Sequence, residues 1–368
     1  MQPVARFEIH YTQFLDEHGR AVQAPPEFAA DTAHVTDLYR WMVLMRTFDA
    51  KAIALQRTGQ LGTYAPILGQ EAIQVGIGSA MKSDDVFVPT YREIGAMFMR
   101  GVAMHDILLY WGGDERGSDY TNARGDFPIC VTIGAQTTHA AGAAYALKLR
   151  RAPGAVVCTI GDGATSKGDF YEGLNAAGTW RLPLVFVISN NQWAISVPRS
   201  AQSAAQTLAQ KAIAAGMTCE QVDGNDLFAV RHAIDRALTT ARSGGGPSLI
   251  EAITYRLSDH TTADDASRYR SADELAQAWK REPIQRVRTW LMAQGAWDKQ
   301  REEALTRECN ERVQAAVQTY IDTPAPPPGA MFEHLYASLP PALEPQRADL
   351  DACTSAPESA PGGGAEQV

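Results

Sequence analysis

The sequence predicts an α/β fold in which a parallel β-sheet is covered by helices on both faces. Short apolar runs typical of buried strands alternate with helical segments, and strands connected through helices form parallel crossovers. Two of these runs, 156–160 and 184–188, each end in a polar cluster. Because parallel strands end at a common edge of the sheet, the two clusters should meet where open α/β sheets bind ligands.

Local patterns predict the individual elements. The segment 36–59 has helical periodicity, with a threonine at its start and a glycine at its end, and both residues favour helix boundaries. The expected strands are 86–88, 156–160, 184–188, 219–222 and 248–255. The expected helices are 36–59, 71–81, 94–99, 104–110, 137–150, 168–180, 207–215 and 227–243, followed after a polar loop by 273–290 and 301–320.

These elements divide the chain into four parts. Residues 1–35 form an irregular N-terminal arm, and residues 36–322 form the α/β domain with a helical C-terminal extension. A proline-rich break near residue 325 starts a third segment, 323–353. The last segment, 354–368, is rich in serine, proline, glycine and alanine, and such a composition predicts disorder.

Composition excludes several classes of protein. The formal net charge of −9 and the lack of a basic run argue against a nucleic-acid surface. The five cysteines contain no CxxC pair, which favours a reducing compartment. The N-terminus lacks the apolar core of a signal peptide, and no apolar segment is long enough to span a bilayer. We therefore expect a cytoplasmic protein without nucleic-acid or membrane partners.

The polar clusters suggest a magnesium site. Asp162 lies between Gly161 and Gly163 at the end of one strand, and Asn191 follows the next strand. The segment fits neither a Walker A loop nor a dinucleotide fingerprint. Asp162, Asn191 and the carbonyl of Trp193 offer hard oxygens that suit Mg²⁺, and the glycines allow a diphosphate to approach the backbone. Alone, each cluster would be a turn or a strand terminator, but their pairing across a helix favours a ligand site.

These motifs resemble those of the thiamine diphosphate enzymes, in which GDG is followed by NN after almost thirty residues. More narrowly, the chain resembles the E1 α subunits of the 2-oxo acid dehydrogenase complexes from about residue 38 to 339. The matching segments are GTYAPILGQEA, PTYREIG, TIGAQTTHAAGAAYALK, the GDG to NN segment, and YRLSDHTTADDASRYR. The resemblance implies the thiamine diphosphate-binding fold, with thiamine diphosphate and Mg²⁺ as cofactors.

The resemblance also implies roles around the diphosphate. Asp162, Asn191 and the Trp193 carbonyl would bind Mg²⁺. Gly161, Gly163 and Ala164 would lie next to the diphosphate, which Tyr91 and Arg92 would also reach. The alternative for Tyr91 and Arg92 is a surface pair at a strand end. Ile133 would lie against the aminopyrimidine, and a core position is its alternative.

The polar loop 258–270 gains a role only through the resemblance, because by itself it would be a solvated surface loop. His260 would orient and protonate intermediates, and Tyr269 and Arg270 would help to order the loop. In mitochondrial relatives a phosphorylated serine follows this histidine, whereas here the residue is Thr261. Gln70 and Glu71 match the family's GQEA segment but receive no role, because a capped helix start explains them equally well.

The family builds each site from two similar α/β domains, and this chain contains only the diphosphate-binding one. We therefore expect an E1 β subunit in an α₂β₂ heterotetramer, with residues 323–353 as a partner-docking segment. The implied reaction is oxidative decarboxylation of a small 2-oxo acid and acylation of the lipoyl domain of E2. Pyruvate is the favoured substrate, and branched-chain 2-oxo acids or acetoin are the alternatives. An alternative of another class is a non-catalytic interaction subunit.

Overall fold

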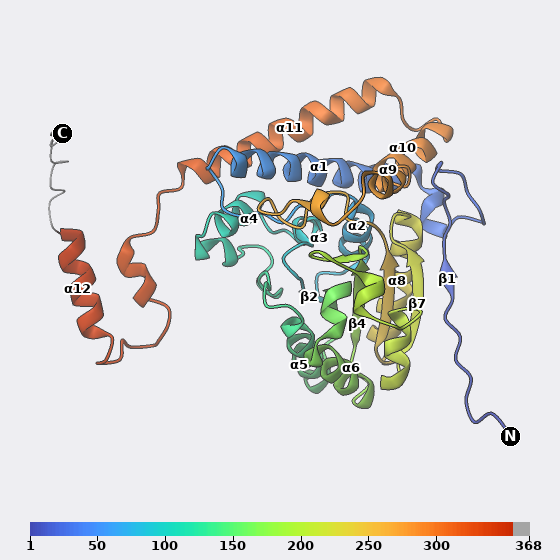
Figure 1. Ribbon diagram of the computed structural model, residues 1–368, viewed down its shortest axis with the longest axis horizontal. Helices are drawn as coiled ribbons and strands as arrows, with labels where there is room; N and C mark the ends of the chain where they lie inside the picture. Colours follow the sequence, from blue (N-terminus) through green and yellow to red (C-terminus); the bar gives the residue numbers. More distant parts are fainter. Residues whose placement is uncertain (356–368) are drawn as a thin grey trace. The chain divides into compact units, whose positions relative to one another are not determined.

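A computed structural model describes residues 1–355 and divides the chain into two compact units, Met1–Tyr320 and Ile321–Val368 (Figure 1). The first unit contains the sheet and its covering helices. Within residues 1–355, no helix combines the length and the apolar character needed to cross a membrane.

The first unit contains a six-stranded sheet, in the described part of the chain, with the order β1-β7-β8-β4-β3-β2 and every neighbouring pair parallel. The predicted parallel α/β fold is therefore confirmed. The strands are β1 (Tyr11–Thr12), β2 (Val86–Val88), β3 (Val156–Gly161), β4 (Leu184–Asn190), β7 (Thr218–Asp223) and β8 (Ser248–Ile253).

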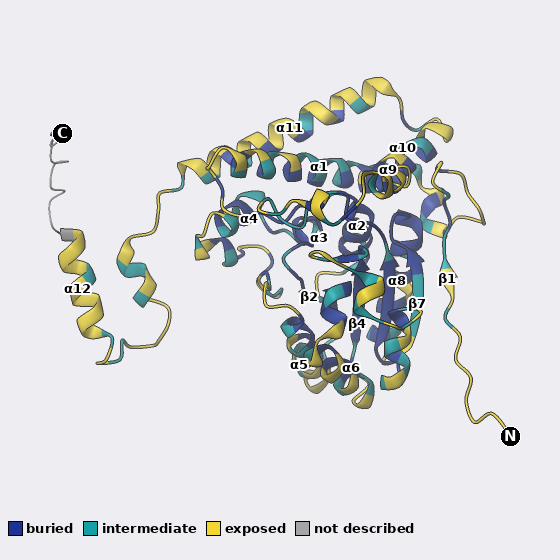
Figure 2. Ribbon diagram, viewed as in Figure 1, coloured by how far each residue is buried: buried dark blue, intermediate teal, exposed yellow. Residues whose placement is uncertain are grey.

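The sheet separates two apolar cores, because alternate strand residues point to opposite faces. Val157, Val185 and Ile250 belong to the core shared with α1 (Thr32–Arg57), α2 (Glu71–Ala80) and α8 (Leu227–Arg242). Cys158, Phe186 and their neighbours belong to the core shared with α5 (Ala135–Arg150) and α6 (Gly168–Thr179). Figure 2 shows the middle of the sheet, around β4, dark blue between these helices. Both faces are therefore covered, as the sequence predicts.

Further helices complete the first unit. They are α3 (Ile94–Met99), α4 (Met104–Trp111), α7 (Arg199–Gln202), α9 (Ala272–Trp279), α10 (Pro283–Ala293) and α11 (Lys299–Asp322), the last of which extends two residues past the unit's end. Short 3₁₀ helices are η1 (Glu27–Ala30), η2 (Glu115–Ser118), η3 (Asp162–Ser166), η4 (Ala209–Ala215) and η5 (Ala266–Arg268). The α11 helix runs beside α1 and buries Leu305 and Val313 in the core there (Figure 1).

Several elements differ from the sequence prediction. The expected helix 273–290 is two helices, because Pro283 starts α10 and Glu282 caps it through the Ile284 and Gln285 amides. The expected helix 207–215 is the 3₁₀ helix η4. The arm expected to be irregular contributes strand β1, which pairs with β7. A short antiparallel hairpin of β5 (Trp193–Ala194) and β6 (Val197–Pro198) was not predicted.

The second unit contains η6 (Pro328–Phe332) and α12 (Glu344–Ser355), which contact each other. Thr354 and Ser355, the first two residues of the segment 354–368 that the sequence predicts to be disordered, are the last residues of α12. The rest of that predicted tail, residues 356–368, lies outside the described part of the chain.

Candidate active site

A cavity of about 230 Å³ opens at the carboxyl ends of β3 and β4. The register of these strands places Gly161 opposite Ser189, so that the polar clusters after both strands enter one space. All ten residues proposed from the sequence line this cavity: Tyr91, Arg92, Ile133, Gly161, Asp162, Gly163, Ala164, Asn191, Trp193 and His260. The geometry thus brings the predicted set together, while the role of each residue stays a prediction.

Asp162 is a buried carboxylate with an unused acceptor. It begins η3 directly after β3, is 2% exposed, and its Oδ2 atom has no hydrogen-bond partner among the described residues. Burial raises the pKa of Asp162 to about 6, although nearby backbone amides and the Arg256 guanidinium oppose the shift. A bound cation would relieve the cost of the unpaired charge.

Asn191 and Trp193 supply the other predicted oxygens. The amide of Trp193 donates to Asn191 Oδ1 at 3.3 Å, and Asn191 Nδ2 donates to Gln70 Oε1 at 3.4 Å. The Trp193 carbonyl accepts from Arg256 Nη1 at 3.2 Å, which leaves one of its two lone pairs.

The donor set fits Mg²⁺ held together with a phosphate ligand. Residues 1–355 contain no group of three or more His, Cys, Asp or Glu side chains arranged to bind a metal. A cation beside Asp162 would therefore depend on one carboxylate, neutral protein oxygens and oxygens of the ligand, which is a typical environment for Mg²⁺.

Glycine is required at one of the two positions that flank Asp162. A Cβ atom on Gly163 would lie 2.8 Å from the Cβ of Ala194, and the Gly163 carbonyl accepts from Gln202 Nε2 at 2.8 Å. A Cβ on Gly161 would meet no atom within 4 Å. Packing therefore explains Gly163, whereas at Gly161 a side chain would enter open space.

Two buried arginines lie at the site: Arg92 lines the cavity, and Arg256 contacts the lining residues His260 and Trp193. Arg256 is completely buried and donates to the Ile195 carbonyl at 2.9 Å and to the Tyr269 hydroxyl at 2.7 Å. Arg92 is also buried and donates to the carbonyls of Pro66 and His260. In the described part of the chain, neither guanidinium has a carboxylate within ion-pair distance. Burial, together with Arg92 and Arg270, lowers the pKa of Arg256. Buried cations with only neutral partners favour binding of an anion.

His260 lies between these arginines and Tyr91. Its Nδ1 atom is 3.3 Å from Arg92 Nη2 and 3.2 Å from Arg256 Nη1, and its Nε2 atom is 3.5 Å from the Tyr91 hydroxyl. Burial and the two guanidinium groups lower the pKa of His260 to about 3. The imidazole is therefore neutral at physiological pH.

Tyr269 and Arg270, the other two residues singled out in the loop 258–270, hold the loop that carries His260 in place. Tyr269 donates its hydroxyl to Asp264, which also accepts from the His260 amide at 2.9 Å. Arg270 donates to the carbonyls of Arg256 and Ser258. These contacts hold the loop in the place where His260 faces the cavity.

The sequence prediction missed several residues of the site. Arg256, which does not line the cavity but contacts His260 and the Trp193 carbonyl, was not singled out, although a cationic residue just after a buried strand was a usable signal. Gln70 and Glu93 lie in matched segments but received no role, and both line the cavity. The other missed lining residues are Thr90, Cys130, Gly134, Gln136, Ser189, Ala194, Ile195 and Gln202.

Comparison with known proteins shows that the chain is similar to alpha subunits of E1 dehydrogenase components. The model of the dehydrogenase E1 component family matches residues 39–329. The pyruvate dehydrogenase E1 component subunit alpha of Acholeplasma laidlawii is 41% identical over 342 residues, covering 90% of this chain and 96% of the relative. The 3-methyl-2-oxobutanoate dehydrogenase subunit alpha of Mycobacterium tuberculosis is 42% identical over 315 residues, covering 86% of each chain.

A third relative extends the same pattern. The pyruvate dehydrogenase E1 component subunit alpha of Staphylococcus aureus is 38% identical over 343 residues, covering 93% of this chain and 92% of the relative. The match of the family model and the near full-length similarity to alpha subunits confirm the resemblance found in the sequence. The chain belongs to the dehydrogenase E1 component family.

Proposed function

We propose that this chain is the alpha subunit of a thiamine diphosphate-dependent E1 enzyme that decarboxylates a 2-oxo acid and acylates the lipoyl group of an E2 partner. The observation that carries the proposal is that one cavity contains two groups of opposite charge, each of which lacks a partner for its charge. The unpartnered Oδ2 of Asp162 favours binding of a cation, and the buried Arg92, which lines the same cavity, favours binding of an anion. A metal-bound diphosphate satisfies both.

Each residue has a separate task in this proposal. Asp162, Asn191 and the Trp193 carbonyl would hold Mg²⁺. Gly163 brings the backbone close to the diphosphate, and Arg92 neutralises its charge. Bound thiamine diphosphate would supply the nucleophilic carbon and the electron sink for decarboxylation.

His260 would take part in proton transfer and orient the reacting group. Its neutral ring carries its proton at Nε2, the nitrogen that faces the Tyr91 hydroxyl, and can donate a hydrogen bond from there. The loop contacts of Tyr269 and Arg270 keep this nitrogen at the cavity, so that proton exchange needs no movement of the backbone.

A beta subunit would complete the site in an α₂β₂ assembly. Ile133 and Ile195 line the cavity yet are 44% and 57% exposed, and apolar side chains at a cavity mouth favour a covering partner. We further propose that residues 323–353 contribute to docking of the beta subunit.

The five cysteines are all free, which supports a reducing, cytoplasmic location.

Pyruvate is the substrate we propose. The relatives include both pyruvate and 3-methyl-2-oxobutanoate dehydrogenase subunits at similar identity, so branched-chain 2-oxo acids remain the second candidate. The motif GTYAPILGQEA favours pyruvate, and acetoin is a third candidate.

The test is co-expression with the beta subunit and measurement of CO₂ release from pyruvate, 2-oxobutanoate and 3-methyl-2-oxobutanoate. We expect turnover that depends on thiamine diphosphate and Mg²⁺, with the highest kcat/KM for pyruvate. A higher value for the branched acid would reassign the substrate. No cofactor binding and no turnover by a folded assembly would favour the non-catalytic interaction subunit.

A further inference from the structure

Gln70 is a buried cavity residue with an unused hydrogen-bond donor. It precedes α2, is 2% exposed, and lines the same cavity as Asp162 and Asn191. Its Nε2 atom has no partner within the described part of the chain. A buried donor without an acceptor is destabilising, and a ligand in the adjoining cavity could supply the acceptor for this one.

The neighbouring contacts fix which end of the Gln70 amide is unused. The Trp193 amide can only donate, so the Asn191 atom that it contacts is Oδ1. Asn191 therefore directs Nδ2 toward Gln70, and the Gln70 atom that receives this contact is Oε1. The atom left over is Nε2, which is a donor and suits an anionic oxygen.

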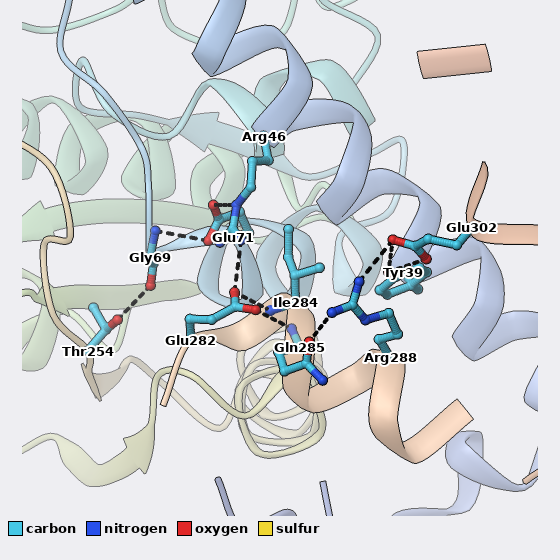
Figure 3. A network of polar contacts seen from close by, with 10 residues as sticks. All are labelled: Tyr39, Arg46, Gly69, Glu71, Thr254, Glu282, Ile284, Gln285, Arg288 and Glu302. Atoms are coloured by element: carbon cyan, nitrogen blue, oxygen red, sulfur yellow. Dashed lines mark hydrogen bonds and ion pairs between the residues drawn. The ribbon is translucent and has the colours of Figure 1, made fainter. Parts of the chain in front are cut away.

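The backbone on either side of Gln70 is held rigidly. Gly69 has a φ of 92°, and its amide donates to Glu71 Oε2 at 3.0 Å while its carbonyl accepts from Thr254 Oγ1 at 2.8 Å (Figure 3). A Cβ on Gly69 would lie 2.6 Å from the Tyr255 carbonyl oxygen, so only glycine fits there.

A chain of ion pairs anchors this turn to two helices. Glu71 is completely buried and accepts from Arg46 Nε at 2.8 Å, and Arg46 Nη1 donates to Glu282 Oε2 at 2.9 Å. Glu282 in turn caps α10 (Figure 3). These contacts therefore fix the backbone position from which the Gln70 side chain extends, as a binding residue requires.

We propose that Gln70 is a further cofactor-binding residue, whose Oε1 holds the Asn191 amide and whose Nε2 donates to a diphosphate oxygen. This inference rests on the function proposed above and assigns a role to the GQEA segment. It also accounts for the contacts of Gly69 and Glu71 drawn in Figure 3, which would position Gln70.

The test compares three variants in the complete α/β assembly by calorimetric titration with Mg²⁺ and thiamine diphosphate. Gln70→Glu keeps the acceptor for Asn191 but replaces the donor with a negative charge, and Gln70→Met removes both polar atoms. Both should lower the affinity for thiamine diphosphate by about tenfold or more. Inorganic diphosphate with Mg²⁺ should lose affinity to a similar extent, because the contact is with the diphosphate.

The matched control is Gln74→Met, one turn further along α2. Gln74 is equally buried and accepts from the Gly95 amide, but it does not line the cavity. This variant should lose stability with little change in affinity. Wild-type affinity in either Gln70→Glu or Gln70→Met would overturn the donor role. Failure of the wild-type assembly to bind the cofactor would instead overturn the proposed function together with this inference.

Discussion

The Nδ1 atom of His260 lies 3.2 Å from Nη1 of Arg256. A guanidinium group has no acceptor, so Nδ1 must accept this hydrogen bond and cannot carry a proton. Arg92 Nη2 approaches the same nitrogen at 3.3 Å and imposes the same constraint. The ring proton therefore belongs to Nε2, the nitrogen next to the Tyr91 hydroxyl.

The same contacts predict how His260 affects stability as the pH falls. The pKa of His260 is lowered to about 3 in the fold, below its ordinary value, so the unfolded chain binds a proton before the folded chain does. The His260 contribution to stability is complete above about pH 6.5 and decreases as the pH falls toward 3. Between pH 8 and pH 5.5, the decrease should amount to about 1.4 kcal/mol.

The measurement is the free energy of unfolding in urea at both pH values for the wild type and for His260→Asn. Asparagine keeps an acceptor near the arginines but does not titrate, so the variant should lose about 1.4 kcal/mol less on acidification. Equal losses in the two proteins would contradict a neutral, shielded His260.

The contribution of Asp162 to stability should have the opposite pH dependence. Its carboxylate should also lower the stability of the fold while it strengthens cofactor binding. Its pKa is raised to about 6, so burial of the charged form has no cost below about pH 4 and its full cost above about pH 6. Without metal at pH 8, Asp162→Asn should therefore raise the free energy of unfolding by about 1 to 3 kcal/mol. The same change should weaken thiamine diphosphate binding by well over tenfold, that is, by more than about 1.4 kcal/mol.

Urea unfolding in the presence of a chelator gives the first quantity, and calorimetry of the α/β assembly gives the second. Asp169→Asn is the control, because Asp169 lies outside the cavity and pairs with Lys167. If Asp162→Asn destabilised the metal-free chain, the carboxylate would have a structural role instead.

The purified chain without a beta subunit should bind thiamine diphosphate weakly and release little CO₂. Its cavity has only the wall that we propose to bind the diphosphate, while Ile133 and Ile195 remain exposed at the mouth. Adding the beta subunit should restore both properties, as measured by calorimetry and by CO₂ release. Robust turnover by the chain alone would exclude the two-chain site.

Much of this site could be predicted from the sequence because its main pair depends on strand topology. Asp162 and Asn191 each follow a strand, and parallel neighbours necessarily bring such residues to one edge. Arg256 follows β8, the parallel neighbour of β4, so the same reasoning could have placed it, whereas Gln70 could not be placed in this way. Gln70 meets Asn191 across 121 positions through a loop, and no periodicity encodes that contact.

The errors in secondary structure have similarly local causes. An apolar pattern of seven residues cannot distinguish a 3₁₀ helix from an α-helix, which explains η4. The two residues of β1 are too few to show alternation, so their place in the sheet depends on pairing with β7. Pro283 was a visible break signal, and the prediction of one helix over 273–290 overlooked it.

Isoleucine at position 195 should destabilise the fold relative to a residue that adopts the local backbone conformation readily. It follows β5 and precedes the β6 hairpin strand with a φ of 55°, a left-handed conformation that β-branched residues rarely adopt. Its side chain is 57% exposed, so little packing opposes a substitution. Asparagine tolerates this conformation, and Ile195→Asn should raise the free energy of unfolding by about 1 kcal/mol.

Retention of a strained isoleucine at the cavity mouth suggests that its side chain serves binding there. In the α/β assembly, Ile195→Asn should therefore combine higher stability with weaker thiamine diphosphate binding or lower kcat/KM. Ile133→Asn is the matched control, because Ile133 also lines the cavity and is partly exposed but has no positive φ. That control should gain no stability. If Ile133→Asn and Ile195→Asn shifted urea unfolding equally, backbone strain at Ile195 would not be the cause.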